Sequence, residues 1–192
     1  HLSLRRQRQM CIRDSRDTVL AIARRGGKAA VLFVDTFNGT FESENALAAA
    51  RVLQAAGYVL HTVEKRGAHH CCGRTYLASG MVDEAKRKAE ALIDALLPLA
   101  RAGVPVVGLE PSCLLTLRDE TLVMGFGEKA ETVAKQALLF EEFVAREVRA
   151  GRFELALKPA EAPILLHGHC HQKAFGAVSP VSYTHLTLPT KA

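Results

Sequence analysis

The sequence lacks several features that assign a chain to a common functional class. Its 192 residues contain no apolar run near the roughly 18 residues that a membrane-spanning helix needs. They contain neither a GxGxxG fingerprint nor a phosphate-binding P-loop, so no nucleotide site is indicated. The tight CxxCxxC spacing of ferredoxins is also absent, which excludes a cubane cluster held by that motif.

The two ends of the chain differ in composition from the rest. Residues 5–15 and 181–192 resemble translations of one sequencing-library adapter read in opposite directions, so we expect 1–15 and 181–192 to be disordered artefacts. Four of the five net positive charges lie in these segments, whose charged residues are Arg5, Arg6, Arg8, Arg13, Asp14 and Lys191. The rest of the chain is nearly neutral, so we expect no nucleic-acid partner.

Cysteine is sparse in the remaining chain. Residues 16–180 are enough for one core, and they contain Cys71, Cys72, Cys113 and Cys170. Their spacing is not that of a disulfide scaffold, so we expect reduced thiols in a cytoplasmic protein, at metal, catalytic or buried positions.

Strand and helix patterns alternate along the chain. Short apolar runs predict strands at 28–37, 58–65 and 104–110, and residues 162–170 are expected to begin a fourth strand. Helical periodicity predicts helices from Ser43 as a cap to Gly57, over 81–103 and over about 128–150. This alternation predicts the α/β class, with a Rossmann-like, doubly wound parallel sheet.

Side chains suited to chemistry follow the ends of these predicted strands. They are Asp35, Cys71, Cys72, Glu110, Cys113 and the group His167, His169, Cys170 and His171. The carboxyl ends of the strands in a doubly wound sheet form one edge, where sites gather. Neighbouring residues on an extended backbone point to opposite sides, so Cys71 and Cys72 are suited to a group larger than one atom.

Three stretches carry a resemblance to a known family. "HHCCGRTYLASGMVDEAK" (69–86), "GVPVVGLEPSCLLTLRDE" (103–120) and "LLHGHCHQKA" (165–174) resemble the CCG, or cysteine-rich, domain of iron–sulfur oxidoreductases. This domain occurs in the glycolate oxidase iron–sulfur subunit, in heterodisulfide reductase, in anaerobic glycerol-3-phosphate dehydrogenase and in fused FAD-linked 2-hydroxy-acid dehydrogenases. The resemblance implies two similar halves, a first over 16–160 and the start of a second over 161–180.

The resemblance also implies a site and its partners. Cys71, Cys72, Cys113, Asp35 and Glu110 match the metal positions of the first half, with carboxylates at two cysteine positions, and Cys170 matches the opening cysteine of the second. The implied cofactor is a 4Fe-4S type cluster that relays electrons from FAD, in a missing part of the parent protein, to a quinone or carrier. The implied place is the cytoplasm or the inner face of the membrane, and we expect the chain alone to be inactive.

Three alternatives stay open. Zinc prefers thiolate and imidazole, so the three cysteines could bind it with one histidine among His69, His70, His167, His169 and His171. A domain that has lost its cluster would be a docking surface in the same enzyme. A thiol nucleophile would need a paired base, which the sequence does not identify.

Overall fold

The computed structural model describes residues 15–65, 68–155 and 167–186. The chain divides into two compact units, residues 1–139 and 140–192. The expected boundary between two half-domains, after residue 160, lies outside the described residues.

A four-stranded parallel sheet forms the centre of the first unit. Its order is β2 (Val59–His61), β1 (Ala29–Phe33), β5 (Val106–Gly108) and β6 (Ala137–Leu139). Every residue of β1 and β5 is buried, as expected for parallel strands that are covered on both faces. The predicted α/β class and the Rossmann-like, doubly wound sheet are therefore confirmed.

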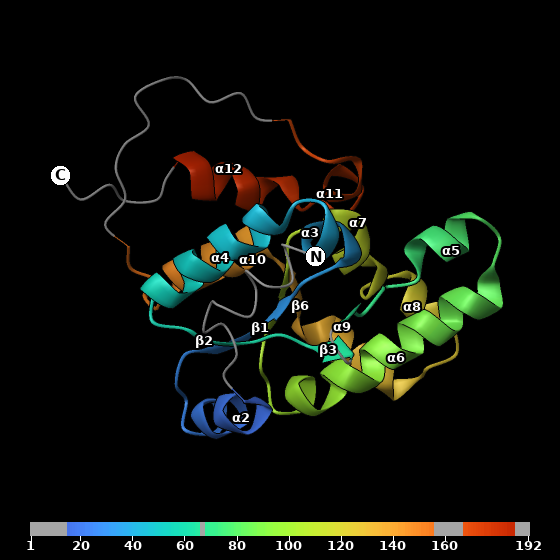
Figure 1. The fold of residues 1–192 in the computed structure, drawn as a ribbon. Helices are drawn as coiled ribbons and strands as arrows, with labels where there is room; N and C mark the ends of the chain where they lie inside the picture. Colours follow the sequence, from blue (N-terminus) through green and yellow to red (C-terminus); the bar gives the residue numbers. More distant parts are fainter. Residues whose placement is uncertain (1–14, 66–67, 156–166, 187–192) are drawn as a thin grey trace. The chain divides into compact units, whose positions relative to one another are not determined.

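Helices cover both faces of this sheet. Figure 1 shows α4 on one side and α2, α6 and α9 on the other. The helices of this unit are α2 (Arg16–Arg24), α3 (Thr36–Thr40), α4 (Ser43–Ala55), α5 (Arg74–Ala78), α6 (Val82–Arg101), α7 (Pro111–Thr116), α8 (Glu120–Val123) and α9 (Glu128–Gln136). A two-stranded antiparallel ribbon, β3 (Glu64–Lys65) and β4 (Ala68–His69), leads to the cysteine pair.

The apolar stripe of α6 confirms the predicted periodicity. Ala85, Ala89, Leu92 and Leu96 are completely buried, whereas Val82 at the start of the helix is exposed. The helix ends before Gly103, whose φ of 74° is the left-handed conformation that terminates many helices.

Two local predictions are wrong. Ser43 is the first helical residue of α4, and the N-cap position belongs to Glu42, which makes no side-chain cap bond. The predicted helix over 128–150 is interrupted, because Ala137–Leu139 form β6 and pair in parallel with Val106–Gly108. Ala137 and Leu139 are buried in that pairing, so the tertiary partner outweighs the helical periodicity of the surrounding sequence.

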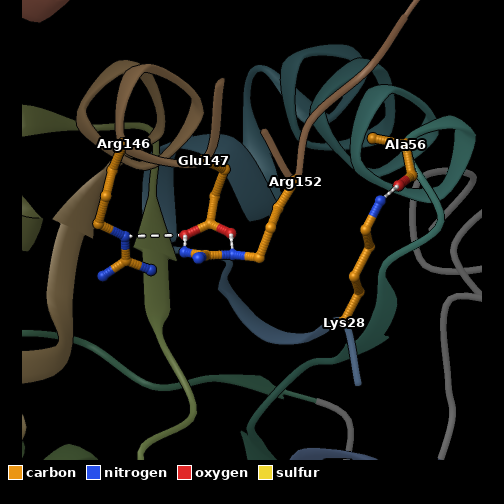
Figure 2. Close-up of polar contacts among 5 residues, drawn as sticks. All are labelled: Lys28, Ala56, Arg146, Glu147 and Arg152. Atoms are coloured by element: carbon orange, nitrogen blue, oxygen red, sulfur yellow. Dashed lines mark hydrogen bonds and ion pairs between the residues drawn. The ribbon is translucent and has the colours of Figure 1, made fainter. Parts of the chain in front are cut away.

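A lysine fixes the end of α4 against the start of β1. Lys28 Nζ donates a hydrogen bond to the Ala56 carbonyl at 3.0 Å (Figure 2). A cation at a helix C-terminus satisfies an otherwise free carbonyl and interacts favourably with the helix dipole. The contact therefore joins the helix of the β1–α4–β2 crossover to the strand that precedes it.

The second unit contains α10 (Phe140–Arg149), α11 (Cys170–Ala174) and α12 (Val178–Leu186). Glu147 of α10 is buried and accepts from two arginines (Figure 2). Arg152 donates from Nε at 2.7 Å and from Nη2 at 2.8 Å, and Arg146 donates from Nε at 2.9 Å. The carboxylate therefore links α10 to the segment that follows it.

We expect Glu147→Gln to lower the free energy of unfolding by about 1–2 kcal/mol, because the amide cannot accept from both arginines as the carboxylate does. Both guanidinium groups are about half exposed, which limits the effect through solvent screening. Urea denaturation measures the change. The exposed Glu154 is the control, since Glu154→Gln should stay within about 0.5 kcal/mol. Equal losses in both variants would contradict a role for the arginine contacts.

The segments expected to be adapter-like artefacts are described only in part. Ser15 caps α2 by accepting from the Thr18 amide at 3.1 Å, and residues 181–186 belong to α12. Residues 1–14 and 187–192 lie outside the described residues.

Candidate functional site

Two short helices begin at the carboxyl edge of neighbouring strands. β1 and β5 pair directly, and α3 and α7 follow them at this edge (Figure 1). Asp35 is the N-cap of α3: its Oδ1 accepts from the amides of Phe37 at 2.8 Å and Asn38 at 3.1 Å. Its Oδ2 accepts from Asn38 Nδ2 at 2.6 Å. The buried carboxylate therefore fixes the first turn of α3 with both oxygens.

Glu110 is the N-cap of α7. Its Oε1 accepts from the Ser112 amide at 3.0 Å and from the Ser112 hydroxyl at 2.6 Å. Pro111 occupies the first helical position, where its missing N–H costs nothing. Cys113, two residues further, is buried in the first turn of α7. Both carboxylates that the sequence suggested as ligands thus serve as helix caps.

Three of the predicted cysteines come together in the first unit. The side chain of Cys72 interacts with the side chains of both Cys71 and Cys113. Cys72 is 2% exposed and Cys113 is 6% exposed, while Cys71 is partly exposed. We call this set, Cys71, Cys72 and Cys113, the thiol row. The convergence of these two segments is what the topology of the predicted sheet implied.

The thiols of the cysteine pair are weak acids in this arrangement. The interaction with Cys72 and burial raise the pKa of Cys71 well above its usual range. The interaction with Cys113, together with burial, raises the pKa of Cys72 to about 12. Both side chains are therefore neutral thiols near pH 7 unless a metal displaces their protons, and they are poor nucleophiles.

Gly73 sets the path of the backbone after the pair. Its φ of 89° is left-handed, and a Cβ at this position would lie 2.5 Å from the carbonyl oxygen of Ala85 in α6. The Gly73 amide donates to Cys71 Sγ at 3.4 Å. The structure therefore requires glycine here for both conformation and space.

A hydroxyl that sequence reasoning missed also contacts this row. The Thr36 side chain, at the first position of α3, lies close enough to Cys71 to lower the pKa of that thiol, although Cys72 and burial raise it by more. The signal available in the sequence was its place directly after Asp35, at the end of a predicted strand.

The histidines before the pair have different surroundings. His69 packs against α3, because a Cβ at Gly39 would lie 2.3 Å from the imidazole carbon Cδ2. Both of its ring nitrogens are buried, and neither has a hydrogen-bond partner within the described part of the chain. His70 is partly exposed.

The remaining candidate residues lie in the second unit. Cys170 is exposed and begins α11, with His169 as the N-cap and His171 as the second helical residue. The strand expected over 162–170 is therefore wrong at its end, where Cys170 is helical, and residues 162–166 lie outside the described residues. His169 Nδ1 accepts from the His171 amide at 3.2 Å, and the two rings stack with centroids 5.2 Å apart. His167 is exposed and precedes this turn.

The positions of these cysteine, histidine and carboxylate side chains bear on which metal ion or cluster they could bind. Within residues 15–65, 68–155 and 167–186, no three His, Cys, Asp or Glu side chains gather around a point suited to one metal ion. A single tetrahedral zinc needs such a gathering, since its thiolate sulfurs all lie about 2.3 Å from the ion. Thiolate sulfurs are soft donors that suit both zinc and the iron of a cluster, so the donor chemistry of the three cysteines agrees with either group.

The chain is similar to part of a known dehydrogenase. It is 27% identical over 128 residues to one of the subunits of the anaerobic glycerol-3-phosphate dehydrogenase of Escherichia coli strain K12, and equally to the same protein of Escherichia coli O157:H7. The match covers 66% of this chain and 31% of each relative, so the chain spans less than a third of their length. No family model and no solved structure matches the chain. The similarity supports a relation to a dehydrogenase subunit, whereas no family model identifies the CCG domain in this chain.

Proposed function

We propose that this chain is part of the electron-transfer portion of a flavin-linked oxidoreductase, in which Cys71, Cys72 and Cys113 hold an iron–sulfur cluster of the 4Fe-4S type. The thiol row at the carboxyl edge of the sheet is the observation that carries this proposal. Thiolates are the ligands that cluster iron needs, and the row supplies three from two segments. The similarity to one part of a dehydrogenase supports the oxidoreductase class.

The parent enzyme that we propose is of the 2-hydroxy-acid dehydrogenase type, acting on glycolate or lactate, with FAD in another part of the protein. A quinone or a carrier would be the acceptor, in the cytoplasm or at the inner face of the membrane. None of the helices that the structure describes is both long and apolar enough to cross a bilayer. Cys170, in the second unit, would open a second set of ligands.

The residues of the site have separable tasks in this proposal. When bound, a cluster supplies the uptake and release of single electrons. Asp35 and Glu110 fix the first turns of α3 and α7, so the segments that carry the site keep their backbone positions. The Gly73 amide donates to Cys71 Sγ, and such hydrogen bonds stabilise a thiolate and raise reduction potentials. Burial of Cys72 and Cys113 keeps water from their sulfurs.

The test is the content of iron, sulfide and zinc in the anaerobically prepared full chain, together with electron paramagnetic resonance spectra of its oxidised and reduced forms. We expect iron with matching sulfide, visible absorption and a redox-dependent signal. Zinc without iron would instead support the structural zinc site. Neither metal would support a docking domain that has lost its cluster.

A further inference from the structure

Two helices, one in each unit, are built in the same way. α3 and α11 each have five residues and follow an N-cap residue with extended backbone. The φ and ψ angles are −72° and 175° at Asp35, and −63° and 146° at His169. Each cap side chain accepts from the amide two residues further on, at 2.8 Å from Phe37 and at 3.2 Å from His171.

The likeness continues to the end of both helices. The third helical residue is a buried amide that bonds back to the cap: Asn38 Nδ2 donates to Asp35 Oδ2, and Gln172 Oε1 accepts from the His169 amide. The C-cap residue is phenylalanine in both, Phe41 and Phe175. Their amides donate to the carbonyls four residues earlier, at 2.8 Å and 3.0 Å. Each residue of the second turn follows its counterpart in the first by the same number of positions, so the two turns share one local motif.

This correspondence assigns the cysteine of the second copy. Cys170 is the first residue of α11, and its counterpart is Thr36, the first residue of α3. Asp35 corresponds to His169, a cap residue. The carboxylate of Asp35 already accepts three hydrogen bonds from its own helix turn, and the residue is 2% exposed. Thr36, in contrast, is exposed, and its side chain interacts with the Cys71 thiol and lowers its pKa.

We propose that Thr36, not Asp35, occupies the fourth place of the thiol row, next to Cys71. This inference deepens the proposed function and rests on it only for the identity of the bound group. The hydroxyl is a harder and less acidic ligand than a thiol, so it leaves the row with three soft donors and an oxygen. A cysteine at this position would give a row of four thiols.

Thr36→Cys is the decisive variant, with Thr40→Cys as the matched control at an exposed position on the same helix. In metal-free full-length protein, mild oxidation followed by peptide mapping should find a disulfide between residue 36 and Cys71 in the first variant. No disulfide to the thiol row should form in the control. After anaerobic reconstitution with iron and sulfide, Thr36→Cys should retain iron against a chelator about tenfold longer than the wild-type chain.

The outcomes separate this inference from the proposed function. Iron loss at the wild-type rate in Thr36→Cys would overturn the inference while leaving the proposed function intact. If neither chain binds iron, the proposed function fails, and the position of Thr36 beside Cys71 is then tested by the disulfide map alone. A bridge to Cys71 then supports the place of Thr36, and its absence overturns it. Should Thr36→Cys fail to melt cooperatively, Thr36→Val should lose iron faster than wild type, and unchanged retention would overturn the inference.

Discussion

Replacing Cys72 with serine is expected to lower the iron bound per chain by at least about tenfold. Cys72 is the middle member of the thiol row, where its side chain interacts with both Cys71 and Cys113. It is almost fully buried, so no outside ligand can replace its sulfur without moving the chain. The serine hydroxyl is a harder donor that loses its proton less readily than a thiol. Iron and sulfide analysis after anaerobic reconstitution measures the effect.

Cys11→Ser is the matched control for this variant, since it makes the same chemical change in the adapter-like segment. It should bind as much iron as the wild-type chain. Circular dichroism should show that both variants fold, because serine is smaller than cysteine and needs no rearrangement of the core. Wild-type iron content in Cys72→Ser would show that the iron is bound elsewhere in the chain and that the cysteine pair holds no cluster.

Gly73→Ala is expected to lower the free energy of unfolding by roughly 2–4 kcal/mol. A left-handed φ costs a residue with a Cβ on the order of 1 kcal/mol, and crowding in a packed region costs about 1–3 kcal/mol more. The crowding is severe at this position, because the new methyl would meet the Ala85 carbonyl oxygen in α6 at 2.5 Å. Urea denaturation of the metal-free chain measures the loss.

Gly80→Ala separates the two causes. Gly80 also has a left-handed φ, of 75°, but a Cβ there would meet nothing within 4 Å. We therefore expect a loss of only about 1 kcal/mol, which represents the backbone strain alone. If the two variants lose the same free energy of unfolding, the close approach of residue 73 to α6 adds nothing to the cost of a side chain there.

The sequence was sufficient to predict the sheet but not all of its strands. β1, β2 and β5 are short apolar runs bounded by polar residues or glycine, so their patterns are distinct. β6 lies between two amphipathic helices, with no glycine or proline between Lys135 and Phe140 to mark a break. Only its pairing with β5 identifies it as a strand, and pairing between distant segments is not visible in a local pattern.

The site was predictable where it depends on topology. Cys113 follows β5, and Cys72 follows β2 after the short β3–β4 ribbon, so the order of elements brings both towards the carboxyl edge of the sheet. The roles of individual polar residues were harder to predict. A carboxylate after a strand can cap the next helix or bind a metal, and hydrogen bonds of Asp35 and Glu110 show capping. Histidine is not a common N-cap residue, so the sequence carries no clear signal for the helix that starts at Cys170.

The helix caps and the glycine at this edge have a consequence for the rate of an electron carrier. Asp35 and Glu110 hold the starts of α3 and α7, and Gly73 lies against the Ala85 carbonyl of α6, where a Cβ has no room. A site whose surroundings are fixed in advance changes its geometry little when its charge changes. In the cluster site proposed above, the reorganisation energy on gaining or losing an electron would then be small. A small reorganisation energy permits fast transfer at a modest difference in redox potential between donor and acceptor.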